Sequence, residues 1–248
     1  LAVSVNALAV ATQKRGDLAG ARALFEEGLS LWRKRGDRMA VSRGLSNLAS
    51  VVKAQEEYSE ASRLYEESLA GSVAMGDRSG AAVTLGNLGD LAREQQDFQA
   101  ARSFHEQSLA GFREIGDPWG IATALTDLGS LARDEGDYER SHALHEEGLR
   151  LFEGLGHRRG IARLLEELAR SASAQGHSRR ALQLAGAAAA LRETIGSPQA
   201  EPAHSTLERA LEPARSRLGV AESLAAWSEG RAMTIEEIVE YARRPRVS

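Results

Sequence analysis

The chain has 248 residues, of which 42% are hydrophobic and 27% are charged, a balance typical of a soluble folded protein. Its formal net charge of −4 excludes the basic surface of a nucleic-acid-binding domain and the polybasic patch of a membrane-surface protein. The absence of cysteine excludes disulfides, thiolate metal ligands and a cysteine nucleophile.

The start of the chain and its composition indicate where it comes from. It begins at Leu1 without a signal-peptide pattern, and no apolar run approaches the ~18 residues of a membrane span. We therefore expect a cytoplasmic piece of a longer protein. Only three of its 31 basic residues are lysines, and because lysine codons are AT-rich, this bias indicates a GC-rich bacterial genome.

A forty-residue repeat occupies most of the sequence. Glycine recurs at this interval at Gly36, Gly76, Gly116, Gly156 and Gly196. Three complete copies align without a gap, a partial copy precedes them and a degenerate copy follows. We predict five repeats, over residues 1–37, 38–77, 78–117, 118–157 and 158–197. Such a period is typical of stacked structural units that bury a continuous core.

Each repeat contains two stretches of helical spacing. In residues 78–117, Leu85, Leu88 and Leu91 share one face of a first helix, and an equivalent stripe begins at Ala101 on a second helix. Both stripes recur in the other copies. The sequence therefore predicts an all-α fold, a right-handed α-solenoid of antiparallel helix pairs.

The stretch Gly116-Asp117-Pro118 separates one repeat from the next. Glycine adopts the left-handed conformation of a helix C-cap at little cost. Aspartate accepts hydrogen bonds from the free N–H groups of the following helix, and proline suits the first helical position. Gly76-Asp77 repeats the pattern, so we interpret these motifs as structural signals that end one helix and start the next at each repeat junction.

Residues 198–248 follow the repeats and predict capping helices, because an array of repeats leaves an open hydrophobic end. The segments 201–218 and 220–227 have amphipathic patterns. Thr234 followed by Glu237 is a capping box that opens a last short helix.

The repeat columns "NLG-DLA-----DF--A---HE-SL" resemble the tetratricopeptide repeat in a long, forty-residue form. The stretch "LGNLGDLAREQQDFQAARSFHEQSLAGFREIGD" is similar to repeats of kinesin light chains and of the Leu-Gly-Asn-repeat spindle-orientation proteins. The resemblance covers residues 1–197 and implies a superhelical platform for partners.

A second resemblance covers residues 178–243. This segment, with its ending "WSEGRAMTIEEIVEYA", is similar to the closing part of large bacterial regulators that join an NTPase module to a tetratricopeptide arm. Many of these also carry a LuxR-type or other DNA-binding domain. Neither the nucleotide-binding lysine loop nor the helix-turn-helix occurs in this sequence, so neither activity is assigned to it.

The tetratricopeptide resemblance implies that a ligand lies along a concave wall formed by the first helices. Transferred by motif, the expected groove consists of polar side chains in matching columns of successive repeats. These are Arg43, Ser46, Asn47, Ser50, Lys53, Asn87, Asp90, Arg93, Thr123, Thr126, Asp127, Ser130 and Arg133. In the last repeat the columns decay to Glu167, Arg170 and Ser173.

The groove columns have a definite chemistry. An asparagine side chain both donates and accepts hydrogen bonds, so it can pair with an extended peptide backbone, and arginine can hold a carboxylate with two hydrogen bonds. The alternative is a solvated helix face, which polar residues also populate. His105 and His145 share a column with Phe25 and Tyr65, which favours a packing position over a metal site.

We predict a non-catalytic arm of a bacterial regulator, for protein interaction or for sensing. It would bind a peptide segment or a partner domain, including a domain of the same parent chain. A small-molecule sensor that binds an inducer in the same concavity is the alternative, and an intact scaffold protein is a third. No nucleophile or base stands beside the paired glutamates, so we expect no enzyme, no catalytic or metal-binding residue and no cofactor. We expect neither nucleic acid nor membrane as a partner.

Overall fold

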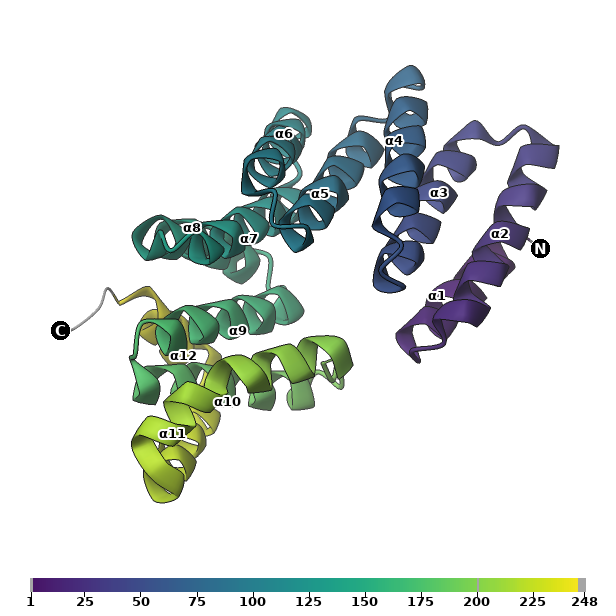
Figure 1. Ribbon diagram of the computed structural model, residues 1–248. Helices are drawn as coiled ribbons and strands as arrows, with labels where there is room; N and C mark the ends of the chain where they lie inside the picture. Colours follow the sequence, from purple (N-terminus) through teal and green to yellow (C-terminus); the bar gives the residue numbers. More distant parts are fainter. Residues whose placement is uncertain (1, 200, 245–248) are drawn as a thin grey trace. The chain divides into compact units, whose positions relative to one another are not determined.

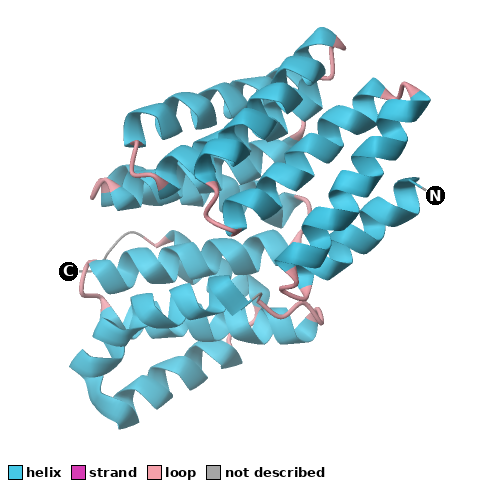
Figure 2. Cartoon of the chain, turned by 45° about the vertical axis from the view of Figure 1, so that its right-hand side comes forward, coloured by secondary structure: helices cyan, strands magenta, loops and turns pink. Residues whose placement is uncertain are grey.

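The computed structural model describes residues 2–199 and 201–244 and contains twelve α-helices in these ranges (Figure 1). Short loops join the helices, and the described residues form no strand (Figure 2). The predicted all-α class is therefore confirmed. None of the helices in this part of the chain combines the length and apolar character that a membrane span requires.

The chain divides into two compact units, with the boundary between Gly120 and Ile121. Unit 1, up to Gly120, holds six helices: α1 (Ala2–Lys14), α2 (Leu18–Arg35), α3 (Arg38–Ala54), α4 (Tyr58–Ala74), α5 (Arg78–Glu94) and α6 (Phe98–Ile115). Unit 2 holds α8 (Tyr138–Gly154), α9 (Arg158–Ala174), α10 (Ser178–Thr194), α11 (Glu201–Ala232) and α12 (Ile235–Arg243). The boundary falls in the first turn of α7 (Pro118–Asp134), most of which belongs to unit 2. The finer division into five repeats and a capping segment stays a prediction.

Unit 1 is held together by the apolar stripes of consecutive helices. Each helix contacts the next one in the chain, and α3 also contacts α5. Leu45, Leu48, Leu64 and Tyr65 form part of one buried cluster, to which Leu88 also belongs. Since burying one such side chain stabilises a fold by roughly 1.5–3 kcal/mol, this cluster fixes the helix pairs.

The turns between repeats have the predicted chemistry. Gly36 and Gly116 end α2 and α6 with φ of 68° and 66°, in the left-handed region. The Asp37 carboxylate accepts a hydrogen bond from the Ala40 N–H at 3.1 Å, and the Asp77 carboxylate from the Gly80 N–H at 2.9 Å. The prediction of a glycine C-cap followed by an aspartate N-cap is confirmed at these junctions.

Two of the turns within repeats lack a glycine that the others have, including the first turn of unit 1 at Gly16, with φ of 85°. In unit 1, Glu56 and Gln96 adopt positive φ of 65° and 63°. The same repeat position in unit 2 carries Gly136 and Gly176, with φ of 82° and 81°. Because a side chain in the left-handed region costs roughly 1–2 kcal/mol, these turns of unit 1 are strained and those of unit 2 are not.

His105 and His145 occupy packing positions, as the sequence predicts. Both side chains are fully buried. A β-carbon added to Gly89 would lie 2.6 Å from the His105 ring, and one added to Gly129 would clash with His145. Gly89 and Gly129 thus make room for the imidazoles of the second helices.

The small residues of α10 allow a close helix contact in unit 2. A β-carbon on Gly186 would clash with the backbone carbonyl of Trp227 in α11, and one on Gly230 would clash with the carbonyl of Gln183 in α10. The alanine- and glycine-rich sequence of α10 therefore brings two backbones together. Gly219, with φ 75° and ψ 173°, breaks α11 at the expected boundary between 201–218 and 220–227.

The last helix is capped at both ends, and α10 supplies the second cap. Thr234 and Glu237 form the predicted capping box at the start of α12. At its other end, the Arg180 guanidinium donates to the carbonyl oxygens of Tyr241, Ala242 and Arg244 at 3.0–3.2 Å. The Arg244 N–H also donates to the Tyr241 carbonyl, at 3.3 Å, so Arg180 adds a C-terminal cap from outside the helix.

Candidate ligand groove

The first helices of unit 1 carry a row of linked amides and hydroxyls. The Asn47 amide of α3 donates to the side-chain oxygen of Asn6 in α1 at 3.3 Å. The Asn87 amide of α5 donates to the Ser46 hydroxyl of α3 at 3.1 Å. Both bonds join residues 41 positions apart, so they are one contact made in two successive repeats. We call Asn6, Ser46, Asn47 and Asn87 the amide ladder.

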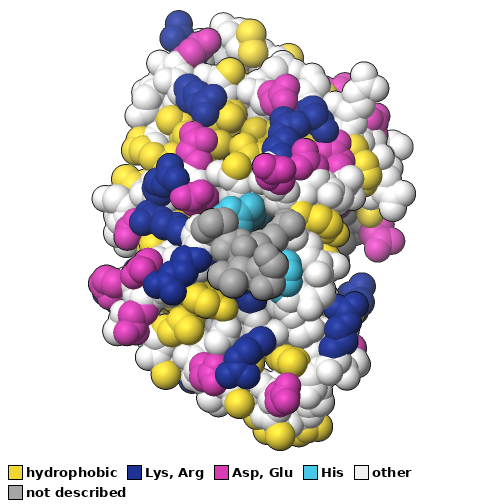
Figure 3. Space-filling model, turned by 90° about the vertical axis from the view of Figure 1, so that its left-hand side faces the viewer, with side chains coloured by type: hydrophobic (Ala, Val, Ile, Leu, Met, Phe, Trp, Pro, Cys, Tyr) yellow, Lys and Arg dark blue, Asp and Glu magenta, His cyan; other side chains and the backbone are white. Residues whose placement is uncertain are grey.

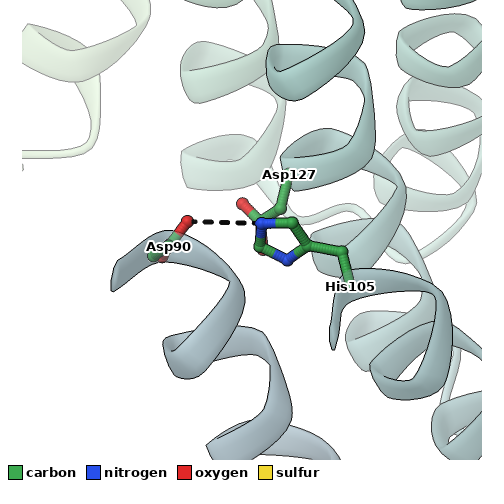
Figure 4. Close-up of side chains that lie close together, drawn as sticks. All are labelled: Asp90, His105 and Asp127. Atoms are coloured by element: carbon green, nitrogen blue, oxygen red, sulfur yellow. Dashed lines mark ion pairs between the residues drawn. The ribbon is translucent and has the colours of Figure 1, made fainter. Parts of the chain in front are cut away.

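A second repeated contact links each first helix to its own second helix. The Ser50 and Tyr65 hydroxyls lie 3.0 Å apart, between α3 and α4. One repeat later, the Asp90 carboxylate lies 3.8 Å from Nε2 of His105, between α5 and α6 (Figure 4). The column Ser50 and Asp90 therefore faces the aromatic packing position.

The expected row of positive charge in unit 1 is compensated. The Lys53 ammonium donates to the Glu94 carboxylate at 2.7 Å. Burial opposes the charge on Lys53, but Asp90 and Glu94 outweigh it, and the pKa of the ammonium is raised. Arg93, the next basic member of this column, is half-buried. The charge of Lys53 is thus balanced by neighbouring carboxylates.

Arg43 lies at the edge of the unit 1 columns. Its guanidinium is exposed and stands 3.4 Å from the Asp77 carboxylate. Together with Ser46 and Asn47 it lines a pocket of about 420 Å³ among α3, α4 and α5. Three of the predicted groove residues therefore meet at one cavity.

In unit 2 the same columns are ionic and closed. Asp127, which replaces the ladder asparagine, is buried and accepts a hydrogen bond from Arg163 of α9 at 2.5 Å. The buried Thr126 hydroxyl donates to the Ala122 carbonyl at 2.7 Å, within its own helix. Thr123 is half-buried beside them.

Glu167 is the centre of the unit 2 columns. Its carboxylate, 8% exposed, accepts hydrogen bonds from Arg133, from Ser130 at 3.1 Å and from Arg170 at 2.9 Å. Burial alone would raise the pKa of Glu167, but the cationic arginines outweigh it and hold that pKa well below its usual range. Ser130 and Arg133 therefore serve an internal ion cluster formed with Glu167 and Arg170.

His145 borders this ion cluster. Its Nε2 lies 3.3 Å from the Thr126 carbonyl oxygen, and the ring is fully buried. Burial lowers the pKa of the imidazole to about 4, even though the nearby Glu167 favours the protonated form. The side chain is therefore neutral at neutral pH.

Two residues of these columns carry roles that the groove prediction does not contain. Asn6 was not among the expected groove residues, although it aligns with Ser46 at an interval of forty and accepts the first bond of the amide ladder. Glu167 was expected only as a decayed position, and it organises the unit 2 columns instead. A carboxylate on a first helix gives no signal in sequence that it will be buried.

One face of the molecule carries charged side chains of both signs. On the face that Figure 3 shows, Lys and Arg side chains lie next to Asp and Glu side chains. This pattern agrees with a formal net charge of −4.

Comparison with known families identifies the repeat. Residues 1–72 match one sequence profile described as tetratricopeptide repeat, and residues 81–115 and 121–154 match a second profile of the same description. Together these matches cover more than half of the sequence. The chain belongs to the tetratricopeptide-repeat family. No curated protein matches it in sequence.

Solved tetratricopeptide-type structures share the fold. BtubC (BKLC) from P. vanneervenii is 21% identical, with a TM-score of 0.61 over 79% of this chain and 81% of that one. A putative kinesin light chain from Podosopora anserina with nearly identical TPR-like repeats is 18% identical, with a TM-score of 0.58 over 78% and 95%. PilF of Pseudomonas aeruginosa is 16% identical, with a TM-score of 0.56 over 92% and 97%. The predicted tetratricopeptide superhelix is confirmed as a fold.

Proposed function

We propose that this chain is a non-catalytic protein-interaction arm, and that unit 1 binds an extended peptide segment of a partner along its first helices. Tetratricopeptide domains generally mediate protein–protein interactions. The expected groove of thirteen residues spans both units, and we assign the binding role to its unit 1 members.

The amide ladder is the observation that supports this proposal. Asn47 and Asn87 are half-buried, and each uses one amide hydrogen in the ladder. A carboxamide offers two donors and an acceptor with two lone pairs, so each side chain keeps donor and acceptor capacity. Two such groups at the same position of successive repeats suit the alternating N–H and C=O groups of a peptide backbone.

The unit 2 columns are less suited to this role. The carboxylate of Glu167 already accepts from three side chains, and that of Asp127 is paired with Arg163. A peptide would have to displace these buried ionic contacts, which costs several kcal/mol when one partner loses its charge neighbour.

The place of the arm in a larger protein rests on residues 178–243. Their resemblance to the closing segment of bacterial NTPase-linked regulators supports a role as the arm of such a regulator. In that arrangement, peptide binding by unit 1 would bias an attached switch module, and the chain itself would perform no chemistry.

A peptide-library selection against the full chain tests the proposal. A selected peptide should bind with an affinity that falls at least about tenfold, the equivalent of 1.4 kcal/mol, when Asn47 and Asn87 are both changed to Ala. Gln107→Ala, which removes an exposed amide from α6, is the matched control and should leave the affinity unchanged. Isothermal titration calorimetry measures both. Equal binding by the double variant and the wild type would refute the groove.

A further inference from the structure

One repeat junction lacks an aromatic ring that the others have. Trp32, Phe112 and Phe152 occupy the same position of three repeats, near the end of the second helix, and are 7%, 4% and 2% exposed. Each ring packs against the first helix of the next repeat. The second repeat, which lies between the repeats of Trp32 and Phe112, has Ser72 of α4 at this position.

Glycines provide the space for these rings. A β-carbon on Gly120 would clash with the Phe112 ring, and one on Gly160 would lie 2.5 Å from the Phe152 ring. Gly80, in the first turn of α5, has the same repeat position as these two glycines. The junction between α4 and α5 therefore keeps the glycine and lacks the ring.

A pocket lies at this junction. Its volume is about 420 Å³, within the range of small-molecule sites, and both Ser72 and Gly80 line it. The other polar walls are hydroxyls and one amide, with Val83 as the apolar wall and Arg43 as the charged residue. The hydroxyls and the amide come from Ser46, Ser68, Ser79, Thr84 and Asn47.

We propose that this pocket binds a phenolic ring, supplied by a tyrosine of the peptide that lies along unit 1. The chain's own Phe112 and Phe152 show that such a junction accepts a flat ring against the bare backbone of a glycine. The Ser68 and Thr84 hydroxyls of the pocket wall are buried and donate to backbone carbonyls of α3 and α5, but each oxygen still has acceptor capacity. Such a wall favours a ring with a polar substituent that donates, such as a phenol O–H.

The charge around the pocket favours a neutral ring over an anion. The Arg43 guanidinium already stands 3.4 Å from the Asp77 carboxylate, whose negative charge repels a carboxylate or phosphate. An exposed guanidinium is instead well suited to lie over an aromatic face. Arg43 thus selects for the ring.

The pocket is continuous with the amide ladder. Ser46 and Asn47 belong to the ladder and also line the pocket. A peptide backbone bound to the ladder would therefore carry a side chain to the pocket entrance. For a peptide-borne ring the inference rests on the proposed function, whereas a free phenol would need only the pocket.

The first test fills the pocket from inside. Ser72→Phe restores the ring found in the third and fourth repeats, and Ser72→Ala is the matched control that leaves the pocket open. We expect Ser72→Phe to melt at or above the wild-type temperature and to weaken p-cresol binding at least about tenfold. Ser72→Ala should bind p-cresol with nearly wild-type affinity. Equal p-cresol affinity in Ser72→Phe and wild type, or no binding by the wild type, would overturn the proposal.

A second test uses the unmodified chain, so it does not depend on whether Ser72→Phe folds. In a titration with p-cresol followed by NMR, the backbone amide signals of Gly80 and Thr84 should shift, and toluene should shift them less. Shifts confined to residues outside the pocket would place the ring elsewhere and refute the site.

Two further experiments distinguish a peptide tyrosine from a free phenol as the source of the ring. They also distinguish failure of the pocket from failure of the peptide groove. Changing the tyrosine of a selected peptide to alanine should weaken its binding about tenfold in wild type and little in Ser72→Phe. Asn87→Ala removes a ladder amide that does not line the pocket, so it should weaken the peptide and spare p-cresol. A wild type that binds p-cresol but no selected peptide would leave a phenol pocket without a peptide groove. A wild type that binds a selected peptide but not p-cresol would refute the pocket and leave the groove supported.

Discussion

Asn87 in unit 1 and Glu167 in unit 2 occupy the same position of the repeat, and their surroundings differ. The Asn87 amide is half-buried and makes one hydrogen bond to the Ser46 hydroxyl. The Glu167 carboxylate is buried and accepts from Ser130 and two arginines. One position of the fold therefore supports an open polar surface in one unit and an internal ion cluster in the other.

This difference shows how a repeat can be specialised by single substitutions. A neutral amide costs little to expose, and the proposed function uses the hydrogen-bonding capacity that Asn47 and Asn87 keep. A buried carboxylate must be paired, and each pairing removes an arginine or a hydroxyl from the groove. The unit 2 columns thus link α7 to α9 through buried ionic contacts.

The largest expected effect comes from breaking the ion cluster. Glu167→Ala leaves Arg133, whose side chain is 13% exposed, without its carboxylate, so unfolding should become easier by about 3–5 kcal/mol. Urea unfolding followed by circular dichroism measures the change. Hydrogen exchange of α7 and α9 would locate it in unit 2.

Glu167→Gln is the matched control for charge. It keeps the shape of the side chain and still leaves the arginines uncompensated, so it should also destabilise the chain. A loss below about 1 kcal/mol in both variants, the size of an exposed ion pair, would contradict the view of a buried cluster.

The second expected effect is a pH dependence that originates in unit 2. The pKa of His145 is lowered from 6.5 to about 4 on folding. Between these two pH values the imidazole is therefore protonated in the unfolded chain and neutral in the folded chain. Stability from this group is therefore full above pH 6.5 and falls as the pH drops toward 4, by roughly 3 kcal/mol in total. Glu167, whose folded pKa is depressed, adds a loss only below its ordinary pKa of 4.5.

His145→Phe removes the titrating group and keeps a ring, as Phe25 does in the same column. Melting temperatures between pH 4.5 and 6.5 should then vary less with pH than in the wild type. His204→Ala, at an exposed position of α11, is the control and should leave the wild-type slope in place. An unchanged slope in His145→Phe would mean that other groups carry the dependence.

The local features of the fold could be predicted because each one depends on a few neighbouring residues. A left-handed Gly36 and a capping Asp77 follow from backbone sterics and hydrogen bonding within a single turn. The packing role of His105 follows from Phe25 and Tyr65 in the same column. The repeat itself supplies these comparisons without any structure.

The state of the groove could not be predicted in the same way. Whether a polar column is open depends on side chains about forty residues away, such as Asn6 for Asn47 and Arg133 for Glu167. An alignment at an interval of forty would reveal Asn6, because it falls in the Ser46 column. The burial of Glu167 depends on the packing of α7 against α9, and an alignment of the repeats does not reveal this packing.

A third and smaller effect concerns the strained turns of unit 1. Gln96→Gly should stabilise the chain by about 1 kcal/mol, because glycine adopts the φ of 63° found there without a side-chain penalty. The reverse change in unit 2, Gly136→Gln, should destabilise by a similar amount. Urea midpoints measured for both variants would give opposite signs, and equal signs would exclude turn strain as the cause.

The smallest expected effect is on the free energy of unfolding when the amide ladder is broken. Its size tests whether the ladder stabilises unit 1 or is available to a partner. Asn87→Ala removes one neutral hydrogen bond to Ser46 from a half-buried site, so it should cost only about 0.5–1 kcal/mol. Asp127→Asn, its counterpart in unit 2, loses the ion pair with Arg163 and should cost no less. Urea unfolding of the two variants side by side measures both. If Asn87→Ala cost several kcal/mol, the ladder would hold unit 1 together, and its polar groups would not be available to a peptide.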